Sequence, residues 1–350
     1  MNRFARTFLI SALCWLVLPP AHAAGPENIL VIINDNSPIS REVGLYYAKK
    51  RGVPSKNVLH IKCPTEERMH DKQYPTLVEQ PVKRYLAKTG LKDKVDYLVL
   101  TKGVPIALRG GLSVDGLLMC MDLGLDFEKM KRPLPNPYYD KKEHFSHKKY
   151  GFYLAARLDG YTTKDAKALV DRALAAKPKR EVFLFDLTPA RNTGGYRTFN
   201  DSMKRAHSDL IKRGFLSILE NTYEFVGRRN NLMGYCSWGS NDARFDKEKY
   251  RGNVFLPGSI AETAVSNSAR TFQSTEEGQS LIADLIKSGV TGVKGYVSEP
   301  TLSAIANPAI LFDRYVSGYN LAESFYMASR LIFWKDLVIG DPLTAPYAKR

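Results

Sequence analysis

Cysteine is scarce in this sequence, and several familiar catalytic signatures are missing. After the first 23 residues only Cys63, Cys120 and Cys236 remain, an odd number without a C-x-x-C pair, so we expect neither a disulfide framework nor a zinc ribbon. The chain has no G-x-S-x-G nucleophile elbow, no G-x-x-x-x-G-K-[ST] phosphate loop, no G-x-G-x-x-G fingerprint and no H-E-x-x-H zinc pair. We therefore expect no metal and no cofactor.

Long apolar runs are missing everywhere except at the N-terminus. The chain opens with Arg3 and Arg6, continues with an apolar stretch over residues 8–18, and reaches small residues at Ala21 and Ala23. This order is typical of a secretory signal peptide, which we expect to be residues 1–23. The protein is therefore predicted to be exported, periplasmic or extracellular, with no transmembrane segment after cleavage.

Acidic residues are outnumbered by basic ones. The chain has 51 Lys and Arg against 36 Asp and Glu, a formal net charge of +15, to which Arg3 and Arg6 contribute two. For an exported protein this indicates either a solvated basic surface or an anionic partner, such as an envelope polymer or lipid headgroups. No nucleic-acid-binding module pattern is present, so we expect no nucleic-acid partner.

Apolar runs and helical patterns alternate along much of the chain. The first three apolar runs, interpreted as buried strands, span residues 28–33, 58–61 and 96–101. Helical patterns separate them, and Ser37 with Pro38 fits the start of the first helix while Gly52 fits its end. This order predicts a parallel sheet with right-handed crossovers.

The alternation breaks from Lys102 to Tyr150, which we predict to be an insertion on the surface of the sheet. It resumes with a capping box at Thr162 and Asp165. Later strands are expected at 152–157, 182–185, 232–236, 253–256 and 290–297, and helices at 166–176, 202–212, 276–287 and 311–329. Residues 24–350 are therefore predicted to form a single α/β domain, a three-layer sandwich with a mainly parallel sheet.

In open α/β sheets, ligands bind beyond the carboxyl ends of the strands. Four polar segments follow predicted strands, at 34–37, 235–242, 262–270 and 295–300. Asp242 and Glu262 are candidate acid/base residues, with Ser240 or Ser266 as nucleophile or positioning group. The ligand-binding candidates are Trp238, Asn241, Lys294, Tyr296 and Glu299.

Glu262 has two interpretations. It follows Ile260 and Ala261, and a carboxylate in apolar surroundings needs a partner. The backbone would supply one, or Arg270 or Lys294 in a structural ion pair. Alternatively it faces ligand, and then Trp238, Asp242, Glu262 and Glu299 should line one cleft, because each ends or follows a strand of the same sheet.

Several segments together resemble a family of exported bacterial proteins that has no established activity. The matching segments are Gly234–Asp242, Ile260–Thr263, Gly278–Leu285, Gly289–Tyr296, Tyr319–Tyr326, Val338–Pro342, Asp96–Pro105 and Ala156–Gly160. This resemblance covers nearly the whole chain after residue 23. It implies kinship and export, but no particular chemistry.

The C-terminal half is also similar in layout to gingipain-like cysteine peptidases of the caspase–hemoglobinase fold, which implies a caspase-like or flavodoxin-like sheet. In those peptidases one strand ends in His-Gly and the next in the nucleophilic Cys. Here Trp238 precedes Gly239, and the segment after Pro257 offers Thr263 and Ser266 but no Cys. An indole cannot act as the base that a thiol nucleophile needs.

These observations favour a non-catalytic binding or scaffold protein of the cell envelope on a caspase-like fold, with a peptide or glycan as ligand. The alternative is a hydrolase with a non-standard acid/base constellation at the carboxyl ends of the strands. A third hypothesis is that the basic insertion binds an anionic envelope polymer.

Overall fold

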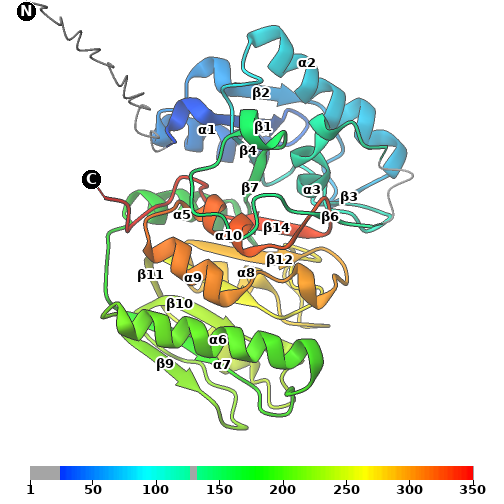
Figure 1. Ribbon diagram of the computed structural model, residues 1–350. Coiled ribbons are helices and arrows are strands. Elements are labelled where there is room, and N and C mark those ends of the chain that lie inside the picture. The colour runs from blue at the N-terminus through cyan, green and yellow to red at the C-terminus, as the bar shows by residue number, and fades with distance from the viewer. Residues whose placement is uncertain (1–23, 127–131, 350) are drawn as a thin grey trace, which may run out of the picture.

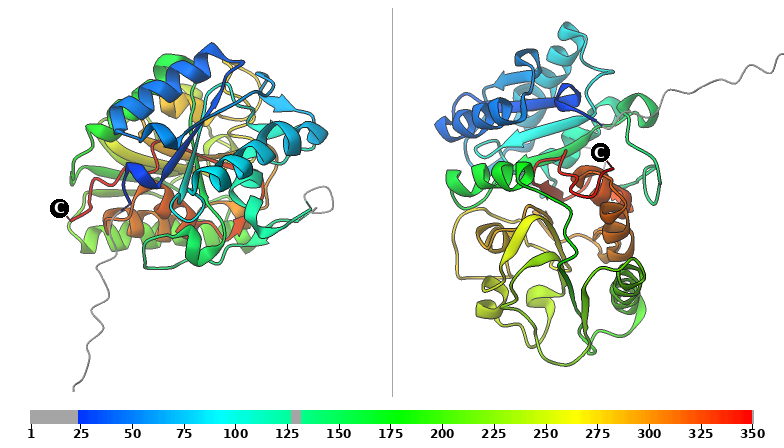
Figure 2. Two further views of the ribbon diagram at one scale, coloured as in Figure 1. Left: turned by 90° about the horizontal axis from the view of Figure 1, so that it is seen from above. Right: turned by 90° about the vertical axis from the view of Figure 1, so that its left-hand side faces the viewer.

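A ten-stranded sheet runs through the molecule, with helices packed on both of its faces (Figure 1 and Figure 2). The computed structural model describes residues 24–126 and 132–349, so the predicted signal peptide lies outside the described residues. The protein is the three-layer, mostly parallel α/β sandwich that the alternating pattern predicts. No helix within the described ranges is long and apolar enough to cross a membrane.

The strands of this sheet follow the order β2–β1–β4–β7–β14–β12–β11–β10–β8–β9. Their bounds are β1 Ile29–Asn34, β2 Val58–Ile61, β4 Tyr97–Thr101, β7 Leu154–Leu158, β8 Val182–Asp186, β9 Ser217–Glu220, β10 Leu232–Ser237, β11 Phe255–Thr263, β12 Gly292–Tyr296 and β14 Asp336–Ile339. Two short ladders pair β3 (Arg68–Met69) with β5 (Ala107–Leu108), and β6 (Leu134–Pro135) with β13 (Leu331–Ile332).

The sheet consists of two parallel halves that run in opposite directions. Strand β14 pairs with β7 in parallel and with β12 in antiparallel orientation, whereas the other neighbouring strands of the sheet are parallel. The carboxyl ends of the two halves therefore lie at opposite edges. The polar segment 34–37, which begins at the last residue of β1, therefore lies at the other edge from the polar segments at the ends of β10, β11 and β12.

Helices α1, α5, α7 and α8 cover one face, and α6, α9 and α10 cover the other (Figure 2). The helix bounds are α1 Pro38–Arg51, α2 Gln80–Thr89, α3 Val114–Met119, α4 His147–Tyr150, α5 Thr163–Leu174, α6 Gly194–Lys212, α7 Lys247–Arg251, α8 Ile282–Lys287, α9 Pro308–Val316 and α10 Leu321–Ala328. The predicted caps are confirmed: Ser37 accepts a hydrogen bond from the Ser40 amide, Gly52 is left-handed, and Thr162 and Asp165 form a capping box.

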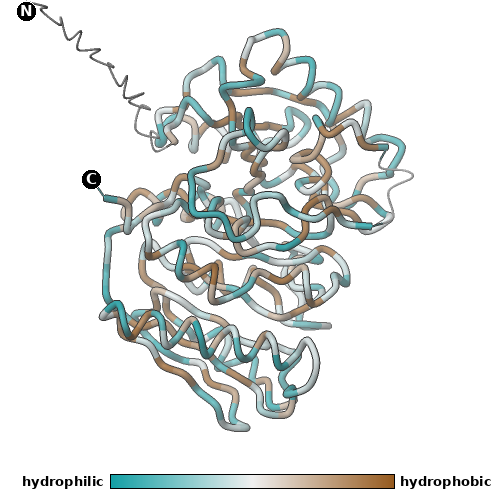
Figure 3. The backbone as a smooth tube through the Cα atoms, viewed as in Figure 1, coloured by the Kyte–Doolittle hydropathy of each residue, from teal (hydrophilic) through white to brown (hydrophobic). Residues whose placement is uncertain are grey.

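Helix α6 illustrates why these helices pack against the sheet. Its buried residues Phe199, Met203, Ala206 and Leu210 recur at helical spacing, so they form one stripe that packs on the sheet. Figure 3 shows hydrophilic and hydrophobic residues alternating along this helix. The opposite, polar side of α6 is left for the surface.

Three predicted elements differ from the structure. The helix expected from Glu276 begins only at Ile282, because the preceding turn is held by Arg270, whose guanidinium donates to the Gln279 carbonyl at 2.6 Å. The helical tail is broken into α9 and α10 near Gly318, where φ is 99°. The strand expected to end at residue 256 continues to Thr263 as β11.

The segment Lys102–Tyr150, predicted as a surface insertion, is partly core. Val104 and Leu118 are buried, and the Val104 carbonyl accepts a hydrogen bond from the buried Arg157 guanidinium, which also pairs with Asp115. Its first part therefore packs into the molecule instead of protruding from the sheet. Residues 127–131 of this segment lie outside the described residues.

The end of β14 provides a test of the fold. Asp341 is fully buried and accepts hydrogen bonds from Arg51 and, at 2.9 Å, from the Tyr47 hydroxyl. These bonds connect the C-terminal strand to α1.

We predict that Asp341→Ala lowers the free energy of unfolding by about 3 kcal/mol, because one partner of a buried pair is lost. Urea unfolding measures this change. Asp171→Ala, at an exposed site, is the control and should cost less than about 1 kcal/mol; equal losses would contradict the anchoring role of Asp341.

Candidate functional site

The carboxyl ends of β10, β11 and β12 bring the predicted site residues to one edge of the sheet. Cys236 pairs with Glu262 in the register of β10 and β11, and Ala261 pairs with Val293 in that of β11 and β12. Glu262 and Lys294 are therefore neighbours on one face of the sheet, on the side of α9 and α10.

Glu262 is completely buried. Its Oε1 accepts hydrogen bonds from the Thr263 amide at 3.1 Å and the Tyr296 hydroxyl at 3.4 Å, while its Oε2 has no hydrogen-bond partner among the described residues. Burial raises the pKa of this carboxyl to about 8, although the nearby Lys294 opposes the shift. At neutral pH the folded protein therefore holds Glu262 mainly as the neutral acid.

Lys294 is also fully buried and has a complete set of partners. Its Nζ donates to the Ser329 hydroxyl at 2.6 Å and the Ala304 carbonyl at 3.0 Å, and it lies 3.1 Å from Asp336 Oδ2. Tyr296, also buried, lies against the same carbonyl at 3.4 Å. These contacts hold the short 3-10 turn Leu302–Ala304 against the sheet.

Trp238 is 1% exposed, and its indole N–H donates to Asn200 Oδ1 at 2.8 Å. The rings of Tyr196 and Phe199 make edge contacts with the indole, with centroids 5.6 and 5.1 Å away. Arg191 places its guanidinium 5.2 Å from the same ring. Trp238 therefore fixes the first turn of α6 to the end of β10.

The remaining candidates occupy several environments. Asp242 is buried and accepts from the Arg244 amide at 2.7 Å, and the half-buried Asn241 donates to the Ala264 carbonyl at 2.5 Å. Ser240 Oγ accepts from the Ser280 amide at 2.9 Å. Ser266 is half-buried, and Glu299 is exposed.

The expectation of one open cleft lined by these side chains is wrong for Trp238 and Glu262, because neither reaches solvent. Both lie one layer behind a surface pocket of about 280 Å³. Phe199, which packs on Trp238, is part of the wall of this pocket, and so is Leu302, in the turn that Lys294 holds. Trp238 and Lys294 therefore support the wall of this pocket from behind and do not line it.

This pocket is one end of a longer depression, which we call the α6–α9 groove. Three pockets compose it, of about 280, 590 and 330 Å³. The first and second share Ser202, Asn307 and Arg330, and the second and third share Lys142, Asp313 and Arg314. The groove therefore continues along α6 and α9, two helices that pack against each other in front of the sheet (Figure 1).

The groove changes in character along its length. At the first pocket the walls include the apolar side chains of Phe199, Leu302 and Ile305. At the middle pocket Arg314 pairs with Asp140 and Asp313, so these groups are held in fixed orientations. Apolar contacts at one end are thus followed by ordered donors and acceptors.

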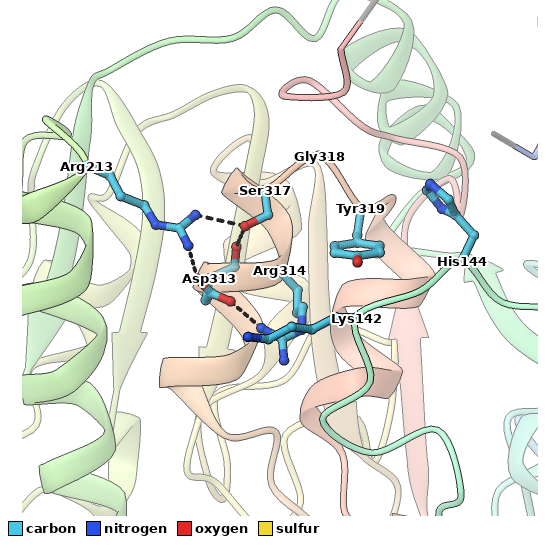
Figure 4. Close-up of a pocket in the computed structure, with 8 residues that line it drawn as sticks. All are labelled: Lys142, His144, Arg213, Asp313, Arg314, Ser317, Gly318 and Tyr319. Carbon is cyan, nitrogen blue, oxygen red and sulfur yellow. Dashed lines mark hydrogen bonds and ion pairs between the residues drawn. The ribbon is translucent and has the colours of Figure 1, made fainter. Parts of the chain in front are cut away.

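The third pocket lies where the last turn of α9 meets α6 and the segment that contains Lys142 and His144 (Figure 4). Arg213 donates to the Ser317 hydroxyl at 2.8 Å and pairs with Asp313. In this view Lys142 overlaps Arg314, and Tyr319 lies between Arg314 and His144 (Figure 4). The pocket is polar, with four basic side chains around a single carboxylate.

His144 anchors this end of the groove. Its Nδ1 lies 3.1 Å from Oε1 of the buried Glu323, and that hydrogen bond raises the pKa of His144. His147, three residues later, is buried and lies 3.1 Å from Asp122. His144 therefore fixes the end of the Lys102–Tyr150 segment to α10, whereas the contact of His147 with Asp122 lies within that segment.

Sequence reasoning missed the residues that line the groove. Asn307 and Pro308 carry a recognisable signal, because Asn307 caps α9 and Pro308 occupies its first position. Thr198 and Arg205 belong to the polar side of α6, which the helical pattern alone shows as a solvated face. No local pattern indicates that this face meets α9.

Known proteins add little to this picture. No protein-family model and no curated protein matches the chain. One solved structure, described as "Structure of Protease", is similar over 92% of this chain and 78% of that chain, with a TM-score of 0.46 and 11% sequence identity. A likeness this distant assigns no activity. Within residues 24–126 and 132–349, no three His, Cys, Asp or Glu side chains come together in a way that would hold a metal ion.

The neutral state of Glu262 predicts a pH dependence. With its pKa raised to about 8, the folded state keeps a proton that the unfolded state releases above about pH 4.5. Its contribution to stability is therefore present at low pH and is lost as pH rises toward 8. The glutamine in Glu262→Gln cannot titrate, so this variant does not lose that contribution. Its free energy of unfolding, measured by urea unfolding, should therefore rise relative to that of the wild type from pH 5 to pH 8.

The matched control is Glu276→Gln, at an exposed carboxylate that pairs with Lys247 and Arg251. This variant should show no relative gain toward pH 8, because the pKa of Glu276 is lowered, to about 2, by those partners. Parallel pH profiles for the wild type and Glu262→Gln would show that Glu262 is ionised in the folded protein.

Proposed function

We propose that this chain is an exported, non-catalytic binding protein of the cell envelope, which holds an extended peptide or glycan segment in the α6–α9 groove. The observation that carries the proposal is the continuity of three pockets along two packed helices. A series of adjoining pockets suits a polymer better than a compact metabolite. Export rests on the sequence of residues 1–23, and descent from a caspase-like hydrolase rests on the resemblance of the C-terminal half.

The chemistry of the groove supports a polymer with both apolar and polar parts. Ligand sites in proteins combine apolar walls with a few polar groups that fix orientation, as Phe199 and Ile305 with Asn307 do in the first pocket. In the middle pocket the mutual pairing of Arg314 and Asp313 fixes their hydrogen-bonding groups before the ligand arrives. Such preorganisation reduces the entropy that binding loses.

The environment of the candidate nucleophiles supports binding over hydrolysis. Cys236 is fully buried, and burial raises the pKa of its thiol well above the usual value, so the reactive thiolate is suppressed. Within the part of the chain that the structure describes, Ser240 is hydrogen-bonded to Ser280 and to no histidine or carboxylate. A serine nucleophile requires an adjacent base to accept its proton.

The hydrolase alternative makes a different prediction for the same residues. It requires Asp242 or Glu262 to exchange protons with a substrate, and hence access to a buried edge of the sheet. Release of soluble fragments from peptidoglycan, abolished by Glu262→Gln in a folded protein, would favour this alternative and overturn the non-catalytic proposal.

Peptidoglycan is a suitable probe, because it contains glycan strands and peptides and is an envelope polymer. Thr198 is exposed on α6 and lines the first pocket, so Thr198→Trp should fill that pocket. We predict that co-sedimentation with purified peptidoglycan weakens about ten-fold or more, equivalent to about 1.4 kcal/mol.

Lys204→Trp, at another exposed position of α6 outside the three pockets, is the matched control. This variant should bind as the wild type does, and both variants should keep the wild-type melting temperature. Equal binding by Thr198→Trp and Lys204→Trp, or no binding by the wild type, would overturn the assignment of the groove to this polymer.

A further inference from the structure

Strand β9 leaves one side of its backbone open. It is an edge strand of the ten-stranded sheet and, among the strands that the structure describes, it pairs with β8 alone. The carbonyls of Leu216 and Glu220 accept hydrogen bonds from Phe183 and Leu187, both at 2.9 Å. Because successive residues of a strand direct their backbone groups to opposite sides, those of Ser217 and Leu219 face the open edge.

The side chains at this edge are apolar. Leu216 is 56% exposed and Ile218 is 39% exposed, and their spacing of two puts them on the same face of the strand. Tyr223, which follows the strand, is 65% exposed. Natural edge strands are normally protected by charges, proline or bulges, and β9 has neither a proline nor a charged side chain between Leu216 and Leu219.

Strand β2, at the opposite edge of the same sheet, does not expose large apolar side chains in this way. In β2 the apolar side chains of Leu59 and Ile61 are buried, and the exposed His60 lies 2.8 Å from Asp35. A polar edge of this kind discourages pairing with another strand. The exposed apolar side chains are therefore a property of β9 and not of both edges of the sheet.

We propose that β9 pairs with β9 of a second copy of this chain, so that two ten-stranded sheets continue into one across a two-fold axis. Two-fold symmetry makes the pairing antiparallel, which brings the start of one strand beside the end of the other. Leu216 and Ile218 then pack against the same side chains of the second copy.

The charge pattern around β9 fits a second copy of the same segment. The exposed Lys212 precedes the strand, whereas Glu220 ends it and Glu224 follows it. In an antiparallel pair the basic start of each strand faces the acidic end of the other. The same short segment therefore supplies the open backbone, the apolar contacts and the complementary charges.

Sedimentation velocity over a range of concentrations tests the proposal on residues 24–350. The wild type should form a dimer, and Ile218→Lys should shift it to a monomer, because two like charges would meet within the pairing. Leu45→Lys is the matched control, since Leu45 is 53% exposed on α1, far from β9 in the sheet order, and it should leave the dimer intact. A wild type that stays monomeric throughout, or an Ile218→Lys dimer, would overturn the proposal.

Hydrogen exchange gives a second readout that does not depend on a variant. The amides of Ser217 and Leu219 should exchange more slowly at concentrations where the dimer forms than where the monomer predominates. A dimer in which these two amides exchange as they do in the monomer would assemble through another surface, which contradicts edge pairing. If Ile218→Lys fails to fold, this comparison on the wild type decides the question.

Discussion

The antiparallel pairing of β14 with β12 is the contact on which the rest of the molecule depends. Among the described strands, β14 is the one that joins the two oppositely directed halves, with four residue pairs to β12 and a single pair, Ile339 with Arg157, to β7. The α6–α9 groove depends on the pairing of β14 with both halves of the sheet, because its walls come from both halves. Helices α6 and α9 pack beside the second half, while the wall at His144 is anchored to Glu323 of α10, which packs on β7 of the first half.

The join also explains why the polar edge of the second half is closed. Asp336, at the start of β14, lies 3.1 Å from Lys294, and Lys294 in turn holds the turn that covers Glu262 and Tyr296. Burial raises the pKa of the Glu262 carboxyl to about 8 and so favours its neutral form, which suits a structural support. The surface available to a ligand therefore lies one layer further out, where Phe199 and Arg330 line the groove.

Much of the fold could be predicted because it is encoded locally. Continuous apolar runs such as residues 29–33 become strands buried on both faces, and caps such as Ser37 are recognised within one turn. The reversal of the sheet could not be predicted, because β14 is four residues long and nothing in it specifies an antiparallel partner. For the candidate site, strand order predicts that Glu262 and Lys294 are neighbours at one edge of the sheet, as the register shows. The burial of Glu262 could not be predicted, because it depends on residues about forty to seventy positions later in the chain, at Ala304 and Asp336.

The central claim is that ligand lies in the α6–α9 groove and not at the carboxyl ends of the strands. Hydrogen exchange of the wild-type protein, with and without soluble peptidoglycan fragments, tests it most directly. The account predicts slower exchange in the first turns of α6 and from Leu302 through α9, with no change at Ser237–Asp242. Protection confined to Ser237–Asp242 and the end of β11, with none along α6 and α9, would contradict it.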